Sequence, residues 1–291
     1  MKLIKPLFNI IEQAFGLKGI YKQIEMAGRT CYKSEDKITE NSAKSFVERM
    51  IQSGHGAMLE HGTVYLYADW YPHAAGSPLS RYKTNKFSKF NWNDNGTYIT
   101  TNLRVLVEND WMDDLQYICE PTEYHEKRHT VKFICDRGVS HEFVRHRTMS
   151  FAQESTRYCN YSKDKFGNEL TFIIPCWLDI PEGQYTYWDG DWCNINKMKI
   201  QLPEGKYKDV DAFLWTLNNA QLHYTLLINS GWKPQEARAI LPNALKTELV
   251  MTGFVSDWKH FFELRDAGSA HPQARELAQP LHEEFIKRNW L

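Results

Sequence analysis

Apolar side chains recur at helical spacing near the start of the chain. In the segment ITENSAKSFVERMIQSGHG, residues 38–56, the helical positions are Phe46, Val47, Met50 and Ile51. Thr39 and Asn41 precede this run as candidate caps, and Gly54 follows it as a stop signal. The first 60 residues are therefore predicted to be helical.

The final third shows the same periodicity over a longer stretch. Residues 211–231 place apolar side chains at alternating spacings of four and three, at Phe213, Leu217, Ala220, Tyr224 and Leu227. This spacing predicts a long amphipathic helix that ends at Gly231. Three further helices are predicted: a short one from Pro234 that ends before Pro242, one from the candidate N-cap Ser256 to Gly268, and one that begins near Pro272.

The middle of the chain changes to a period of two, which is typical of strands. Alternation of apolar and polar residues predicts strands over 63–70 and 130–138, and LTFIIPCW at 170–177 is a third candidate. Residues 97–110 are ambiguous: they begin like a strand, and a helix after Thr101 is the alternative.

Two segments, residues 72–97 and 182–210, lack clear periodicity and are rich in turn-forming residues. They are predicted to be long loops or insertions. The order of helices, then strands, then helices predicts an α+β fold with a central antiparallel or mixed sheet flanked by helices. No internal repeat or low-complexity linker divides the 291 residues, which indicates a single domain over 1–291.

Composition is that of an ordinary globular protein, with 42% hydrophobic and 24% charged residues. The net charge of −1 argues against general binding of polyanions, so any preference for phosphate must be local. The six cysteines form no CxxC pair, and no long apolar run suggests a signal peptide or membrane span. We therefore expect reduced thiols, a cytoplasmic location and no membrane partner.

Several familiar signatures are missing when their spacing is checked. His141 and His146 in HEFVRH are five residues apart rather than four, so they do not share a helix face for one metal, and no metal site is predicted. Neither a GxGxxG motif after a strand nor a GxxxxGK[ST] motif occurs. Cys176 follows a proline and has no basic neighbour, so we interpret it as a buried strand cysteine rather than a nucleophile.

Unusual chemistry is concentrated in VRHRTMSFAQESTRYCNYSK, residues 144–163. Clustered guanidinium groups suit bidentate recognition of phosphate. Hydroxyl, amide and carboxylate groups accompany them and could bind the rest of a nucleotide. The alternative is a solvated basic loop. The stretch and its flank supply Glu142, Arg145, His146, Arg147, Ser150, Gln153, Glu154, Ser155, Thr156 and Arg157.

The arrangement of Arg145-His146-Arg147, seven further residues, and then Ser155-Thr156-Arg157-Tyr158 resembles the signature of the flavin-dependent thymidylate synthases. Three other segments resemble parts of the same family: GHGAMLEH at 54–61, EARAILP at 236–242 and SDWKHFFELRD at 256–266. These segments extend the resemblance over most of the chain.

The resemblance implies an enzyme that converts dUMP to dTMP, with methylenetetrahydrofolate and NADPH as co-substrates and FAD as cofactor. It also implies a homotetramer whose active sites combine residues of several subunits, and the fold of that family in one domain. Because a flavin hydride reaches the pyrimidine in this family, no cysteine nucleophile is required.

Residue roles follow from the same resemblance. Arg265 corresponds to the arginine that stabilises uracil ionised at its ring nitrogen, the catalytic role. Other positions correspond to dUMP contacts: Glu142, Arg145, Gln153, Glu154, Ser155, Thr156, Arg157 and Arg238. Flavin contacts correspond to His55, Ala57, Glu60, Arg145, His146, Arg147, Gln153, Ser256 and His260. Gln153 and Ala57 differ from the residues common there, glutamate and a hydroxyl residue respectively.

Two other functions remain open from the residues themselves. A module that binds RNA or single-stranded nucleic acid could use the basic loop 144–163, although the net charge of −1 and the absence of basic tails speak against it. A thiol-dependent pyrimidine methylase would instead use Cys176. We expect no nucleic-acid partner.

Overall fold

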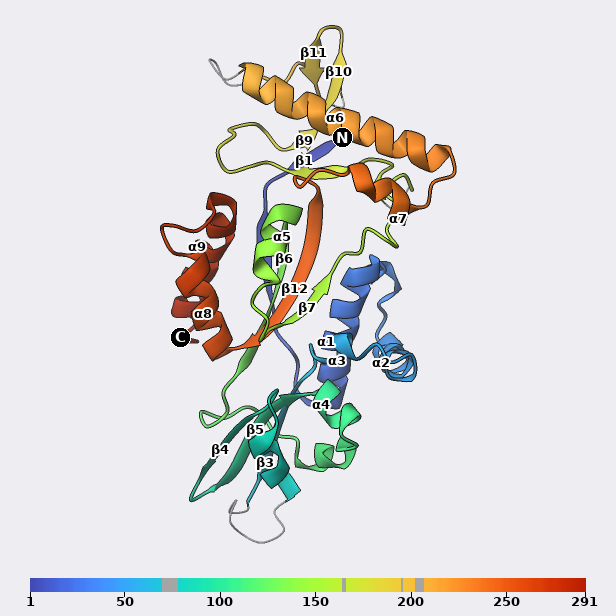
Figure 1. The fold of residues 1–291 in the computed structure, drawn as a ribbon. Helices are drawn as coiled ribbons and strands as arrows, with labels where there is room; N and C mark the ends of the chain where they lie inside the picture. Colours follow the sequence, from blue (N-terminus) through green and yellow to red (C-terminus); the bar gives the residue numbers. More distant parts are fainter. Residues whose placement is uncertain (70–77, 164–165, 195, 202–206) are drawn as a thin grey trace.

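A four-stranded antiparallel sheet lies in the middle of the molecule (Figure 1). The computed structural model describes residues 1–69, 78–163, 166–194, 196–201 and 207–291. The sheet has the order β2-β6-β12-β7, and its strands are β2 (Leu7–Ile11), β6 (Arg128–Asp136), β12 (Lys246–Phe254) and β7 (Ser150–Gln153). The longest pairing joins β6 to β12, with Lys246 opposite Asp136 and Phe254 opposite Arg128.

Alternation along these strands separates the two faces of the sheet. Val131, Phe133 and Cys135 of β6 and Leu249 and Met251 of β12 point to one face and are fully buried there. That face is covered by α5 (Arg137–Phe143), α8 (Val255–Arg265) and α9 (Pro272–Lys287). The other face packs against α1 (Gly16–Tyr32), where Ala27 contacts the cluster of Ala152 and Val250.

One end of the sheet continues into a second, smaller sheet of order β3-β5-β4. Its elements are β3 (Thr63–Ala68), β4 (Lys89–Asn93) and β5 (Gly96–Asn102), with the helices α2 (Ser42–Gln52), α3 (Gly56–Leu59) and α4 (Leu103–Glu108) and the 3-10 helices η1 (Glu35–Lys37), η2 (Pro78–Thr84) and η3 (Met112–Tyr117). A core of β3, β5, α1, α2 and α4 side chains holds this end together.

The long helix α6 (Tyr207–Asn229) crosses the opposite end of the molecule (Figure 1). Beneath it lies a mixed sheet of order β8-β1-β9, in which β1 pairs parallel with β8 and antiparallel with β9. The elements here are β1 (Lys2–Ile4), β8 (Thr171–Ile173), β9 (Gly183–Gln184), the hairpin β10 (Thr186–Trp188) and β11 (Asp191–Cys193), α7 (Pro234–Ala237) and η5 (Arg238–Ile240).

The predicted mixture of helices and strands is confirmed, and so are most of the periodic segments. The predicted helices within 38–56 and 211–231 correspond to α2 and α6, and the strand-to-helix change after Thr101 corresponds to β5 and α4. The strand over 63–70 corresponds to β3, and its predicted last residue, Trp70, lies outside the described residues. The strand predicted over 130–138 ends at Asp136, because Gly138 already belongs to α5.

Other expectations were wrong. Residues 1–11 form strands rather than helix, and the described parts of 72–97 and 182–210 contain β4, the start of β5 and β9 to β11 rather than loop alone. The central strand β12 and the edge strand β7 were missed. Ser256 is not the N-cap of α8: that position is Phe254, whose backbone N–H donates to the Asp257 carboxylate at 2.9 Å.

None of the six cysteines, all within the described residues, forms a disulfide bond. None of the helices in the described ranges combines the length and the apolar character needed to cross a bilayer.

Removing the Phe133 ring should destabilise the sheet more than removing an equally apolar but exposed side chain. Phe133 is fully buried, and its ring centroid lies 5.0 Å from that of Phe143. We expect Phe133→Ala to lower the free energy of unfolding by about 3–5 kcal/mol, because the cavity cannot close completely. Ile286→Ala, at a side chain that is 57% exposed on α9, should change it by less than about 0.5 kcal/mol. Urea denaturation of both variants gives the comparison, and equal losses would contradict this packing.

Candidate active site

The turn after α5 presents the basic triplet. Asp136 begins α5 by accepting a hydrogen bond from the Val139 backbone N–H at 2.9 Å, so the end of β6 leads directly into the helix. Residues 144–149 then turn back, and β7 returns along β12. Within this turn His146 is buried, whereas Arg145 and Arg147 are exposed.

Arg265, at the end of α8, binds two residues of this region. Its Nη1 donates to the Glu142 carboxylate at 2.6 Å and its Nη2 to the Glu142 carbonyl oxygen at 2.9 Å. Its Nε donates to His146 Nε2 at 3.1 Å. A guanidinium has five N–H donors, so two remain for a ligand.

His146 is held in its neutral form. Because Nε2 accepts from Arg265, the ring proton belongs on Nδ1. Burial, then the charge of Arg265, then that of His260, lower the His146 pKa to about 4. The ring also lies 5.8 Å from the His260 ring, which is largely exposed. Four predicted site residues therefore meet here: Glu142, His146, His260 and Arg265.

A second group gathers beyond β7. The Arg238 Nη1 in η5 donates to the Thr156 hydroxyl at 3.2 Å, although the two residues are 82 positions apart. The Ser155 hydroxyl accepts from the Arg157 backbone N–H at 3.3 Å. Arg157 and Arg238 are both exposed and, within the described part of the chain, neither forms an ion pair with a carboxylate. Two guanidinium groups and two hydroxyls thus remain available to an anion.

The third group surrounds the short helix α3. His55 Nδ1 lies 3.1 Å from the Tyr32 hydroxyl, and the Tyr32 ring lies 5.3 Å from that of Tyr158. This contact places His55 beside the second group, because Tyr158 follows Arg157. Ala57 is exposed within α3.

Glu60, the last residue of this group, borders a cleft. Its carboxylate accepts from Arg104 at 2.5 Å, and its carbonyl oxygen accepts from Arg128 at 3.0 Å. Arg128 also donates to the Ser150 hydroxyl at 3.2 Å, which connects α3 to the signature stretch. The cleft has a volume of about 510 Å³ and includes Arg147 in its wall.

Three predicted residues lie differently from the rest. Gln153 donates to the Ser140 and Thr247 hydroxyls at 2.9 and 3.2 Å. The Glu154 carboxylate points into the protein interior, where Lys246 and Tyr161 bind it. Ser256 is exposed at the start of α8, and its backbone N–H donates to Glu126 at 3.0 Å. On α8 Ser256 lies one helical turn before His260 of the first group.

Residues 125–288, more than half of the chain, match the family model Thy1, described as thymidylate synthase complementing protein. The chain belongs to this family. The matched range contains the signature stretch, Arg238 and Arg265, and it confirms the resemblance drawn from the sequence.

Curated relatives of this Thy1 chain carry the name flavin-dependent thymidylate synthase. That of Pyrococcus furiosus is 34% identical over 155 residues, which cover 53% of this chain and 52% of the relative. That of Corynebacterium aurimucosum is 23% identical over 258 residues, 88% of this chain and 71% of the relative. The chain thus spans about half the length of the archaeal relatives.

Among solved structures, the UMP/dUMP methylase PolB from Streptomyces cacaoi, bound with 5-Br dUMP, aligns with 99% of this chain and 93% of its own at 17% identity and a TM-score of 0.44.

The cleft of this Thy1 chain has the donors that a dinucleotide such as FAD requires. Lys86, Lys89, Arg104, Arg128 and Arg147 line it, against the carboxylates of Glu60, Glu108 and Asp257. Arg128 is half-buried, and its buried Nε has no hydrogen-bond partner among the described residues. A cleft of this size with an excess of cations fits the diphosphate of FAD and part of its ring systems.

The interpretation of Cys176 as a buried strand cysteine was wrong. The side chain is exposed and follows β8 in a turn. Partial desolvation and the charge of Glu276 both raise the pKa of its thiol, so the reactive thiolate is disfavoured.

Four cationic residues of the cleft were not found from the sequence. Lys86 and Lys89 lie in a segment predicted to be loop, and Arg104 and Arg128 form no recognisable motif with the signature stretch. The sequence shows only that Arg104 and Arg128 lie near the start of a helix or strand. A basic residue at such a position can contact a ligand or can simply be solvated, so it did not reveal the cleft.

The contact between Arg265 and His146 can be tested through the imidazole. Arg265→Gln removes a nearby positive charge, so we expect the His146 pKa to rise from about 4 and to stay below its ordinary value, because burial remains. Titration of the imidazole proton resonances by NMR measures this shift. Lys259→Gln removes a positive charge elsewhere on α8 and should leave the His146 pKa unchanged. An unchanged pKa in Arg265→Gln would mean that this contact does not form in solution.

Proposed function

We propose that the chain is a flavin-dependent thymidylate synthase, which methylates dUMP to dTMP with methylenetetrahydrofolate as the carbon donor and NADPH as the reductant. The observation that carries this proposal is the family match over residues 125–288, which includes all of the arginines assigned to dUMP. The names of the relatives from Pyrococcus furiosus and Corynebacterium aurimucosum support it.

In this proposal the second group binds the phosphate of dUMP. Arg157 and Arg238 supply guanidinium groups, and Ser155 and Thr156 supply hydroxyls. Charge-assisted hydrogen bonds of this kind are roughly twice as strong as neutral ones. Arg145 lies in the turn between α5 and β7. In this proposal it contacts both dUMP and the flavin.

Arg265 acts on the uracil ring. Its two remaining N–H donors stabilise the negative charge on the ring nitrogen, and a guanidinium does so without titrating. Glu142 holds Arg265 in place with two hydrogen bonds and in this way orients the charge. His146 stays neutral beside it, and so it adds no second positive charge.

FAD is the cofactor of the proposed enzyme, and when bound it supplies the hydride-transfer chemistry. Glu60 and Arg147 hold it in the cleft, and His55, Ala57, His146, Gln153 and His260 contribute from the surrounding surface. Ser256 lies one helical turn before His260 on α8 and contributes from the same side of that helix. The entire chain 1–291 acts as one catalytic domain.

A visible absorbance spectrum tests the proposal directly. We expect the purified protein, supplied with FAD, to show a flavin band that dUMP perturbs. Arg238→Gln should weaken dUMP binding by about 10- to 100-fold, because one charge-assisted contact is lost. The matched control Arg49→Gln, at an exposed arginine of α2, should bind dUMP as the unmodified protein does. Absence of a flavin band and of flavin-dependent NADPH oxidation would contradict the proposed function.

The thiol-dependent alternative predicts a different result for Cys176. We expect Cys176→Ala to keep most of the dTMP-forming activity, because the flavin mechanism needs no thiol and the Cys176 thiolate is disfavoured. A steady-state assay of dTMP formation decides between them: loss of activity by a factor of about 1,000 or more would favour a nucleophilic cysteine.

A further inference from the structure

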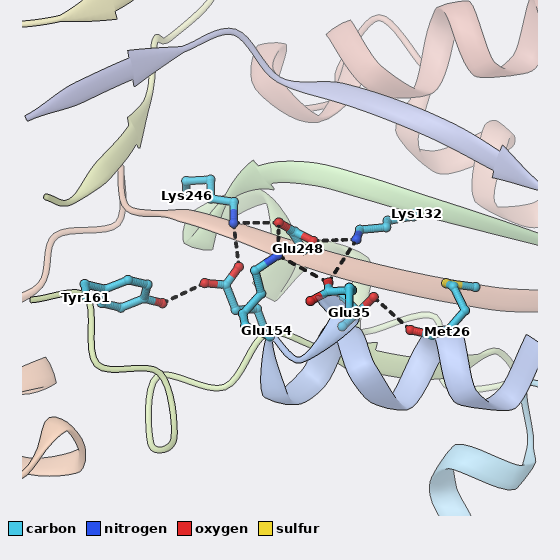
Figure 2. Close-up of polar contacts among 9 residues, drawn as sticks. Met26, Glu35, Lys132, Glu154, Tyr161, Lys246 and Glu248 are labelled. Carbon is cyan, nitrogen blue, oxygen red and sulfur yellow. Dashed lines mark hydrogen bonds and ion pairs between the residues drawn. The ribbon is translucent and has the colours of Figure 1, made fainter. Parts of the chain in front are cut away.

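The face of the central sheet that packs on α1 carries charged side chains at one end. Period-two alternation puts Lys246 and Glu248 of β12 on this face, together with Lys132 of β6 and with Glu154, which follows β7. Lys33, the C-cap of α1, and Glu35 of η1 join them. Figure 2 shows Glu35 beside Lys132 and Glu248. The network is therefore three lysines and three glutamates: Lys33, Lys132, Lys246, Glu35, Glu154 and Glu248.

Glu154 is the most enclosed member of the network. It is 2% exposed, and its carboxylate accepts from Lys246 at 2.7 Å and from the Tyr161 hydroxyl at 3.0 Å. Its backbone N–H donates to the Glu248 carbonyl oxygen at 2.8 Å. The Glu154 carboxylate thus has partners other than Arg238, which donates to the Thr156 hydroxyl two residues further on. Figure 2 shows the Glu154 contacts.

Lys246 connects Glu154 to the rest of the network. Its ammonium group also donates to Glu248 at 2.7 Å. Burial lowers the Lys246 pKa, but the charges of Glu154 and Glu248 outweigh burial and raise it, so the lysine stays protonated. Glu248 is also bound by Lys33 at 2.5 Å and Lys132 at 2.6 Å.

The opposite charges balance within the network, which therefore offers no surplus of positive charge to an outside anion. Taking such ions out of water costs free energy, so a buried network of this kind adds little net stability compared with apolar residues of similar volume. Removing a single partner leaves an uncompensated charge, which is more costly than removing a pair.

Glu154 directly precedes the residues that are proposed to bind the phosphate of dUMP, so the pairing of its charge affects that ligand. Ser155, Thr156 and Arg157 follow it directly, and the Ser155 backbone N–H donates to the Cys31 carbonyl oxygen at 3.0 Å. Backbone hydrogen bonds therefore hold both Glu154 and Ser155 in place at the start of residues 155–157, the segment proposed to bind the phosphate. A Glu154 carboxylate without Lys246 would be an unpaired negative charge next to a bound phosphate dianion.

We propose that Lys246 is a positioning residue for the nucleotide: it neutralises Glu154 and holds its carboxylate inside the protein, so that residues 155–157 face the phosphate without a competing anion. This inference rests on the proposed function, with dUMP as the ligand. It also replaces direct contact between Glu154 and dUMP by an indirect role.

The test compares Lys246→Met with Lys132→Met. Both variants remove one ammonium group from the network, but Lys132 touches Glu35 and Glu248 and not Glu154. We expect Lys246→Met to raise the KM for dUMP by about 10-fold or more, the size of one buried charge contact, with kcat changed by less than about threefold. Lys132→Met should change neither value by more than about threefold.

The double variant Lys246→Met with Glu154→Gln removes both charges and should return the KM for dUMP to within about threefold of the original, as a double-mutant cycle on a coupled pair requires. A KM that stays high after Glu154 is neutralised would overturn the proposal. So would equal effects of Lys246→Met and Lys132→Met, or a loss confined to kcat.

Two further measurements keep the outcome decisive. If Lys246→Met does not fold, as judged by circular dichroism, Lys246→Gln tests the same contact, because glutamine removes the positive charge beside Glu154 and keeps an N–H donor. A KM for dUMP that rises by about 3-fold or more supports the proposal, and a smaller change overturns it. Unmodified protein that shows no binding of dUMP in calorimetry would instead refute the proposed function itself.

Discussion

The pairing of β6 with β12 is the constraint on which the rest of the structure depends. Nine consecutive residue pairs extend over about 31 Å, and because the strands are antiparallel, α5 and α8 start from opposite ends. Helices of 7 and 11 residues reach about 10 and 16 Å, so both run back along the same face and end near each other. The meeting of Glu142 with Arg265 follows from these lengths.

That meeting point also explains why the charged group there is an arginine. A buried lysine beside His146 would lose protons readily, whereas a guanidinium keeps its charge and uses three nitrogens at once. Its Nε fixes the tautomer of His146, and Glu142 fixes the plane of the guanidinium. Orientation is thereby set before any ligand binds, which is the arrangement that electrostatic stabilisation of a developing anion requires.

The sequence allowed prediction of the parts whose signal is local. Periodicity predicted a helix over 211–231, which corresponds to α6, and the signature stretch supplied Arg145, Arg147 and Arg157. The strand β12 was not predicted from the sequence. Both its faces are buried, so it lacks the alternation of apolar and polar residues, and Lys246 and Glu248 interrupt the apolar run that would otherwise indicate a central strand. The direction of Glu154 was equally hidden, since its partner lies 92 residues further along the chain.

Charge is distributed in two distinct ways in this molecule. The lysines of the network neutralise glutamates inside the protein, where their field is cancelled over a few ångströms. Arg145, Arg147, Arg157 and Arg238 are exposed and form no ion pair with a carboxylate in the described ranges. A chain of net charge −1 can therefore present positive charge locally, because the lysines of the network are neutralised inside the protein while these arginines stay exposed. Selectivity for a phosphate ligand then depends as much on which carboxylates are paired as on which arginines are free.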